Sequence, residues 1–252
     1  LFFPEKRDFF LQDTDIFEFG RLGLRNFGSR FSRPLSENGR PFFSRKIGLS
    51  STGQPAELDV GGKLSGRIGR WNLGALAVQQ DEFEAVQAAD LFVGRATANI
   101  LQESNIGVII TNGDPRSNLD NSVLGTDFHY QNTRLSNGKV IEADIWYQQS
   151  NTEGIDGEDA AWSAKFKMPN NTGFRGEVGL KEIQANFIPA LGYINRQDIR
   201  DYTFEAGYTY RSLGGVVRSV YGGAIVERVE YLNGELQSQV ANLRLDIQNQ
   251  TN

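Results

Sequence analysis

The chain has 252 residues, 39% of them hydrophobic, and a net charge of −5 that is spread along the sequence rather than gathered in one block. This length is enough for one all-β domain with a full core, and the even mixture of acids and bases excludes the basic stripe that nucleic-acid phosphates require. The absence of cysteine excludes disulfides, zinc–thiolate sites and thiol catalysis. No segment approaches the roughly 20 apolar residues of a membrane helix, whereas 28 glycines and 17 phenylalanines favour strands and turns.

Residues 1–41 fit no regular element. The first 20 combine six phenylalanines with Pro4 and a run of charges, and residues 21–41 are rich in Gly, Arg and Ser. We expect an irregular, plug-like segment whose aromatic side chains dock on the rest of the chain. The chain opens at Leu1 without a leader sequence, which we interpret as the start of an internal piece of a longer protein.

From Phe42 onward the pattern becomes regular and predicts a β-domain over residues 42–252. We expect about thirteen strands, near residues 42–50, 57–69, 71–80, 90–101, 106–112, 122–132, 139–149, 160–168, 173–183, 187–194, 200–211, 216–231 and 235–249. An odd number of strands, with no closing partner for the last one, predicts an incomplete barrel.

The strand predicted at 139–149 and the one predicted at 160–168 show the two faces most clearly. In the first, Ile141, Ala143, Ile145 and Tyr147 alternate with Glu142, Asp144, Trp146 and Gln148. In the second, Trp162, Ala164, Phe166 and Met168 alternate with Ser163, Lys165 and Lys167. Each strand therefore has an apolar and a polar side, as expected both in a soluble sandwich and in a membrane barrel.

The predicted connections alternate between compact turns and longer polar loops. Gly69-Arg70 and Asn137-Gly138 are tight turns, whereas residues 81–89 and 150–159 form longer excursions. Up-and-down barrels of the bacterial outer membrane have short turns at one end and long loops at the other. The connections after residues 183 and 211 depart from this rule, because they are expected to be long and are short.

Aromatic residues recur where the rims of a membrane barrel would lie. Tyr202 and Tyr210 share a face eight residues apart, which corresponds to about 20 Å along the axis of a tilted strand, near the apolar band of about 25 Å. We assign an aromatic girdle to Trp71, Tyr147, Trp162, Tyr202 and Tyr210. A cross-strand aromatic cluster in a soluble sheet is the alternative.

The charged residues of the other face are assigned to a single lumen. They are Glu57, Asp59, Lys63, Arg67, Arg95, Asp127, His129, Glu142, Asp144, Lys165, Lys167, Arg175, Glu177, Lys181, Glu205, Arg211, Arg244 and Asp246. Acids and bases are mixed, so they can pair across neighbouring strands. On a soluble protein the same residues would form ordinary solvated surface.

The opening FFPEKRDFFL, the FFSRKIGLS segment and the glycine-rich KLSGRIGRW hairpin resemble a family of largely uncharacterised outer-membrane barrel domains of Gram-negative bacteria. The specific part of the resemblance is residues 2–11 and 42–48. In that family the barrel follows an N-terminal domain similar to family 9 carbohydrate-binding modules. The resemblance implies an outer-membrane location and a link to glycan capture, and it supplies no catalytic residues to carry over.

Candidates for chemistry are few. Asp127 and the single histidine, His129, share one strand face and form the best candidate for a hydrolytic Asp–His pair, and Glu142 with Asp144 is the best pair of carboxylates. Both pairs are also ordinary polar lumen residues. The acids at 13, 15 and 18 and those at 153–159 lack the ordered spacing of a calcium loop, so no metal or cofactor is expected.

The sequence thus predicts an antiparallel, up-and-down transmembrane β-barrel, porin-like, with lipid outside and glycan or small solutes as candidate partners of the lumen. Two alternatives stay open: a soluble or surface carbohydrate-binding or carbohydrate-degrading β-protein, and a barrel hydrolase that uses Asp127 and His129.

Overall fold

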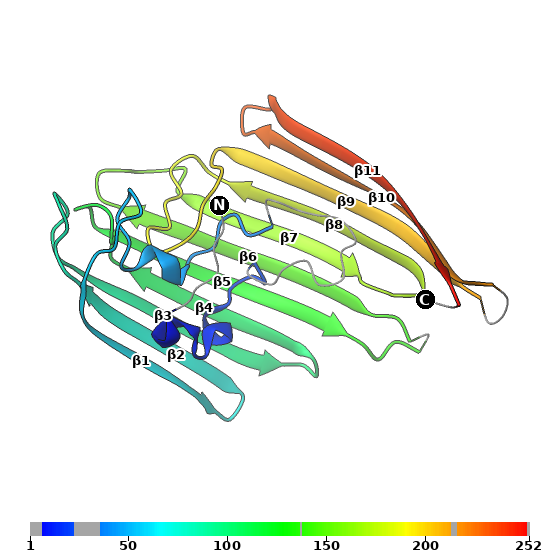
Figure 1. Cartoon of the computed structure of the whole chain (residues 1–252), viewed down its shortest axis with the longest axis horizontal. Coiled ribbons are helices and arrows are strands. Elements are labelled where there is room, and N and C mark those ends of the chain that lie inside the picture. Colours follow the sequence, from blue (N-terminus) through cyan, green and yellow to red (C-terminus); the bar gives the residue numbers. More distant parts are fainter. Residues whose placement is uncertain (1–6, 23–35, 137, 213–215, 251–252) are drawn as a thin grey trace.

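The computed structural model describes residues 7–22, 36–136, 138–212 and 216–250. Eleven strands form one sheet in which each strand pairs antiparallel with the next along the chain (Figure 1). The strands are β1 (Leu58–Ile68), β2 (Trp71–Gln80), β3 (Ala89–Ile100), β4 (Ser104–Asn112), β5 (Asn121–Asn132), β6 (Ile141–Thr152), β7 (Ala160–Met168), β8 (Gly173–Ile183), β9 (Ile199–Arg211), β10 (Val217–Tyr231) and β11 (Leu236–Asn249). The predicted all-β, antiparallel, up-and-down arrangement is confirmed. Over these described ranges the sheet is unclosed, since β1 pairs only with β2 and β11 only with β10.

The expected number of about thirteen strands is wrong, because two of the predicted strands are not part of the sheet. Residues 42–50 contain the short 3₁₀ helix η2 (Ser44–Lys46), and residues 187–194 lie in the connection between β8 and β9. The two segments pack on each other instead: Phe43 contacts the ring of Tyr193, and Arg40 forms an isolated bridge with Tyr193. Pro189 lacks the N–H that a strand position would need.

Removing these two strands brings the connections after residues 183 and 211 into line with the expected alternation of loop lengths. Residues 184–198 become one long connection, at the same end of the sheet as residues 81–88, 113–120 and 153–159. The opposite end carries residues 69–70, 101–103, 133–140, 169–172 and 212–216, which include the shortest connection in the sheet. Two connections depart from the alternation. The tight turn at residues 232–235 lies at the long-loop end, and residues 133–140 form an eight-residue connection at the other end, where a tight turn at Asn137-Gly138 is expected. Asn137 lies outside the described residues.

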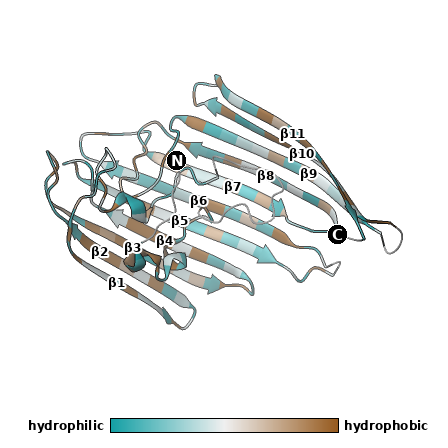
Figure 2. Cartoon of the chain, in the orientation of Figure 1, coloured by the Kyte–Doolittle hydropathy of each residue, from teal (hydrophilic) through white to brown (hydrophobic). Residues whose placement is uncertain are grey.

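The sheet has two chemically different faces, which Figure 2 shows as alternating brown and teal bands along the strands. One of them, called the outer face here, presents large exposed hydrophobic side chains from nearly every strand. They include Val60, Leu64, Ile68, Trp71, Leu73, Phe92, Ile106, Val108, Ile110, Leu124, Ile145, Tyr147, Phe166, Phe174, Val178, Tyr202, Phe204, Tyr208, Tyr210, Val226, Leu243, Leu245 and Ile247. No described element packs over this face.

The N-terminal segment covers the other face, called the covered face here. This segment comprises the described residues 7–22 and 36–57, with the short helices α1 (Asp8–Leu11) and η1 (Thr14–Phe17). Residues 1–6 and 23–35 of the predicted docking segment lie outside the described residues. Phe10, Phe17, Phe19 and Leu22 are buried against Leu76, Val78, Leu91, Val93, Ile109, Val123 and Trp146 of the sheet. None of the helices in the described ranges is long and apolar enough to cross a bilayer.

Two glycines of the sheet let the N-terminal segment approach closely. A Cβ built on Gly74 would lie 2.5 Å from Ile16 Cγ2, and one built on Gly125 would lie 2.9 Å from Phe19 Cζ. These glycines therefore serve as flat contact points on β2 and β5, on which side chains of the segment rest.

A β-bulge at the start of β1 changes the orientation of one predicted residue. Leu58 pairs with Gln80, but Val60 pairs with Gln79, so Asp59 is the extra residue of the bulge. As a result Leu58 packs against the core on the covered face, although simple alternation places it with the apolar set.

Candidate functional site

The covered face gathers almost the whole predicted lumen set. Strand pairing places Lys63, Arg67, Arg95, Asp127, His129, Glu142, Asp144, Lys165, Lys167, Arg175, Glu177, Lys181, Glu205, Arg211, Arg244 and Asp246 on it. Glu57 and Asp59 are the exceptions: Glu57 precedes β1, Asp59 lies in the bulge, and both are exposed. The girdle residues Trp71, Tyr147, Trp162, Tyr202 and Tyr210 all lie on the outer face.

A buried ion pair links β3 and β5 on the covered face. Arg95 on β3 donates from Nη1 and Nη2 to the two carboxylate oxygens of Asp127 on β5, at 2.6 and 2.9 Å. The backbone N–H of Gly20 donates to Asp127 Oδ2 at 3.0 Å. Arg95 and Asp127 are only 4% and 7% exposed. The two-point geometry and the third donor compensate for the loss of water around the charges.

His129 joins the N-terminal segment to β6. Its Nδ1 lies 2.7 Å from Asp144 Oδ1, and its Nε2 lies 3.0 Å from Nη1 of Arg21. Because a guanidinium can only donate, Nε2 must accept that hydrogen bond, and Nδ1 therefore carries the proton that it donates to Asp144. This assigns the neutral Nδ1–H tautomer to His129. Lys167 lies 3.0 Å from the other oxygen of Asp144 and adds a cation to the cluster.

This geometry gives Asp127 and His129 different partners, and it gives Glu142 and Asp144 a shared one. The carboxylate of Asp127 is bound by Arg95 and Gly20, whereas the partner of His129 is Asp144. The His129 lone pair that a general base would use is occupied by Arg21. Glu142 and Asp144 share Lys167 as a cationic partner, at 3.6 and 3.0 Å. Both pairs thus act as parts of an ion-pair network.

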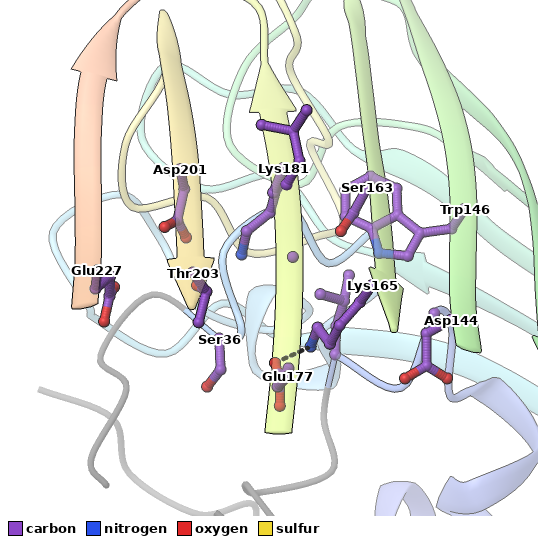
Figure 3. Close-up of a pocket in the computed structure, with 14 residues that line it drawn as sticks. Ser36, Asp144, Trp146, Ser163, Lys165, Glu177, Lys181, Asp201, Thr203 and Glu227 are labelled. Atoms are coloured by element: carbon purple, nitrogen blue, oxygen red, sulfur yellow. Dashed lines mark ion pairs between the residues drawn. The ribbon is translucent and has the colours of Figure 1, made fainter. Parts of the chain in front are cut away.

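Two cavities adjoin this network. The η1 cavity, about 220 Å³ in volume, lies between η1 and strands β2–β6; its lining includes Asp15, Glu18, Arg21, Asn72, Arg95, Thr97, Asn99, Asn105, Asp127, His129 and Asp144. A smaller one, the β8 cavity of about 40 Å³, lies over strands β6–β10. Figure 3 shows its charged lining, with Lys165, Lys181, Glu177, Asp201 and Glu227 extending from four neighbouring strands. Gly20 and Asp144 line both cavities.

Among the residues that the structure describes, no group of three or more histidine and carboxylate side chains is arranged to hold a metal ion. The acids near the start of the chain have protein partners: Asp13 Oδ2 accepts a hydrogen bond from Ser65, and Glu18 pairs with Arg40 at 3.0 Å.

Sequence reasoning missed Arg21, Asn72, Thr97, Asn99 and Asn105 as site residues. Asn72, Thr97, Asn99 and Asn105 occupy covered-face positions in strands that were predicted within two residues of their observed bounds. A search for polar, uncharged residues in phase with Arg95 and Asp127 would have found them. Arg21 carries no such signal, because it lies in an irregular segment.

No protein-family model, curated protein or solved structure matches this chain.

Proposed function

We propose that this chain forms part of the wall of a transmembrane β-barrel in a bacterial outer membrane. In this proposal the outer face contacts lipid, and the N-terminal segment lies within the bore and controls the capture or passage of a small solute or glycan. One observation carries the proposal: large hydrophobic side chains are exposed on one face, while charged side chains are buried on the other. A soluble sheet normally has the opposite distribution.

The outer face also has the banded pattern expected at a membrane. Polar and charged residues of this face, including Gln79, Asp90, Asn112, Ser122, Gln149, Glu182, Arg200 and Glu230, lie toward the long-loop end of their strands. The opposite end carries Trp71 and Tyr210, which are 44% and 61% exposed. Trp162 and Tyr202 lie toward the long-loop end. Aromatic residues thus flank the apolar side chains at both ends, and this distribution favours an apolar band between two rims.

The soluble carbohydrate-binding alternative requires a second layer over the outer face. No described part of the chain supplies one, and side chains such as Leu124 and Phe204 are 59% and 55% exposed. Exposed hydrophobic side chains on nearly every strand of one face differ from the singly scattered ones of an ordinary soluble surface.

The test uses the absence of cysteine from the chain. Single cysteines at Leu124 and Phe204 on the outer face, and at Thr203 on the covered face, are labelled with an environment-sensitive fluorophore. The protein is then placed in vesicles whose acyl chains carry a quencher. We expect strong quenching at the two outer positions and little at Thr203→Cys. Equal quenching at all three positions, or a chain that is monomeric in water without detergent, would refute the membrane assignment.

A further inference from the structure

The η1 cavity lies on the covered face, so what it binds is independent of whether the outer face contacts lipid. From its lining we infer that this cavity is a binding site for a small neutral molecule that carries several hydroxyl groups. The inference deepens the proposed function and rests on the part of it that names a small solute or glycan, to which it assigns a binding site and a neutral, hydroxyl-rich chemistry.

Most of the charges around the cavity already have partners in the protein. Asp127 is held by Arg95, Asp144 by His129 and Lys167, and Glu18 by Arg40. Arg21 donates to His129. A charged ligand would have to break one of these pairs, which would leave a charge of the network without its partner. The carboxylate of Asp15, a further lining acid, is exposed and among the described residues accepts only a hydrogen bond from the Thr14 hydroxyl, at 3.4 Å. The buried part of the lining therefore disfavours both anions and cations.

Uncharged hydrogen-bonding groups form a continuous row on the floor of the cavity. Asn72 lies directly opposite Thr97, and Asn99 lies directly opposite Asn105, which in turn lies opposite His129. Side chains paired in this way across an antiparallel sheet are about 5 Å apart. The row thus extends from β2 to β5 and is anchored on strand backbone rather than on loops.

Several of these groups have unused hydrogen-bonding capacity. The side chains of Asn99 and Asn105 make no hydrogen bond within the described part of the chain, and the bond from Asn72 Nδ2 to Thr97 Oγ1 is long, at 3.4 Å. Arg95, which is 4% exposed, has an Nε donor with no described partner. An amide offers a donor and an acceptor side by side, and a hydroxyl group of a ligand can use both.

Shape and composition together define the ligand class. A cavity of about 220 Å³ admits a small molecule rather than a polymer segment with many residues. Neutral amides and a threonine hydroxyl match a compound with adjacent hydroxyl groups, such as a sugar or a sugar alcohol. Asp15 and Glu18 of the N-terminal segment form the opposite wall of the cavity. A bound molecule would therefore also hold this segment against the sheet.

The test is titration calorimetry of the full chain in detergent with glycerol, xylitol, glucose and trehalose as neutral probes. Glucuronate and glucosamine serve as charged counterparts. We expect saturable binding of at least one neutral probe, and at least tenfold weaker binding of the charged probes. The Thr97→Val and Asn105→Leu variants should each weaken that binding about five- to tenfold, because each removes a polar partner of the ligand. The control, Asn112→Leu, lies on the outer face of β4 and should leave the affinity unchanged.

A second measurement does not depend on these substitutions. A cysteine at Asn99, which is exposed, is the only thiol in its variant, and we expect the neutral probe to slow its reaction with a maleimide severalfold. The inference is overturned if no neutral probe binds saturably, if the charged probes bind equally well, or if the thiol at position 99 reacts at the same rate with and without the probe.

Discussion

At the scale of single residues, the burial of the Arg95–Asp127 pair makes the covered face sensitive to the loss of one partner. Replacing Asp127 by alanine leaves a buried guanidinium uncompensated, and we expect a loss of about 3–5 kcal/mol in the free energy of unfolding. The double variant Arg95→Met/Asp127→Leu removes both charges and should lose less than Asp127→Ala alone. Denaturant titration in detergent measures both. A double variant at least as unstable as the single one would contradict this account.

The contact between Gly74 and η1 gives a second prediction at this scale. A methyl group at Gly74 would meet Ile16 at 2.5 Å, so Gly74→Ala should lift η1 from β2 at a cost of about 1–3 kcal/mol. Limited proteolysis should then cut the N-terminal segment faster. Gly66→Ala is the matched control, because a Cβ at Gly66 has no atom within 4 Å. Equal cleavage rates in the two variants would show that the close approach does not position the segment.

At the scale of elements, the turn between β3 and β4 is tied to the connection that follows β5. Glu103 accepts hydrogen bonds from the backbone N–H of Thr133 at 2.7 Å and from its hydroxyl at 2.6 Å. Both hydrogen bonds lower the pKa of Glu103 below its usual value of 4.5, and the bond from the hydroxyl has the larger effect.

A carboxylate whose pKa is lowered by folding stabilises the folded state at pH values above its pKa in the unfolded chain. This stabilisation is lost as the pH falls through the lowered pKa of the folded state. We therefore expect the Thr133 amide proton to be protected from exchange at neutral pH and to lose protection in acid. In Glu103→Gln the protection should be weaker at neutral pH and should not change over the acidic range. If the protection of the Thr133 amide in the native chain stays constant down to the lowest pH, the ionised Glu103 does not hold the two connections together.

The sequence predicted most elements because alternation is a local signal. The eleven observed strands were each predicted within three residues at both ends, from side chains such as Leu64 and Phe204 that alternate with charged neighbours. The two false strands share another cause. Ile47 in residues 42–50 and Leu191 in residues 187–194 are fully buried in the core, although neither segment is part of the sheet. An apolar run looks the same in both situations.

The candidate site could be predicted only in part. The face of each charged residue followed from alternation, whereas its partner depended on the register between strands and on a segment without periodicity. Asp144 rather than Asp127 pairs with His129 because β5 and β6 place His129 directly opposite Asp144. The contribution of Arg21 depends on how the N-terminal segment crosses the sheet, which no local pattern encodes.

At the scale of the whole molecule, the proposed lipid contact predicts how charges are tolerated. Leu243 on the outer face of β11 is 89% exposed, and its neighbour Asn242 lies on the covered face. Arginine at a lipid-facing position near the bilayer centre costs about 2–4 kcal/mol. We therefore expect Leu243→Arg to reduce the yield of vesicle-inserted protein strongly and Asn242→Arg to have little effect. Similar insertion of the two variants would argue for water on both sides of β11.

The direction of the two edge strands limits how many strands a closed barrel containing this sheet can have. Successive strands alternate in direction, so β1 and β11 run the same way. Joined to each other directly, they would form a parallel pair, whereas bacterial single-chain membrane barrels are closed by antiparallel neighbours. A closed barrel that contains this sheet and has only antiparallel neighbours therefore needs an odd number of additional strands between β11 and β1. Its total number of strands is then even.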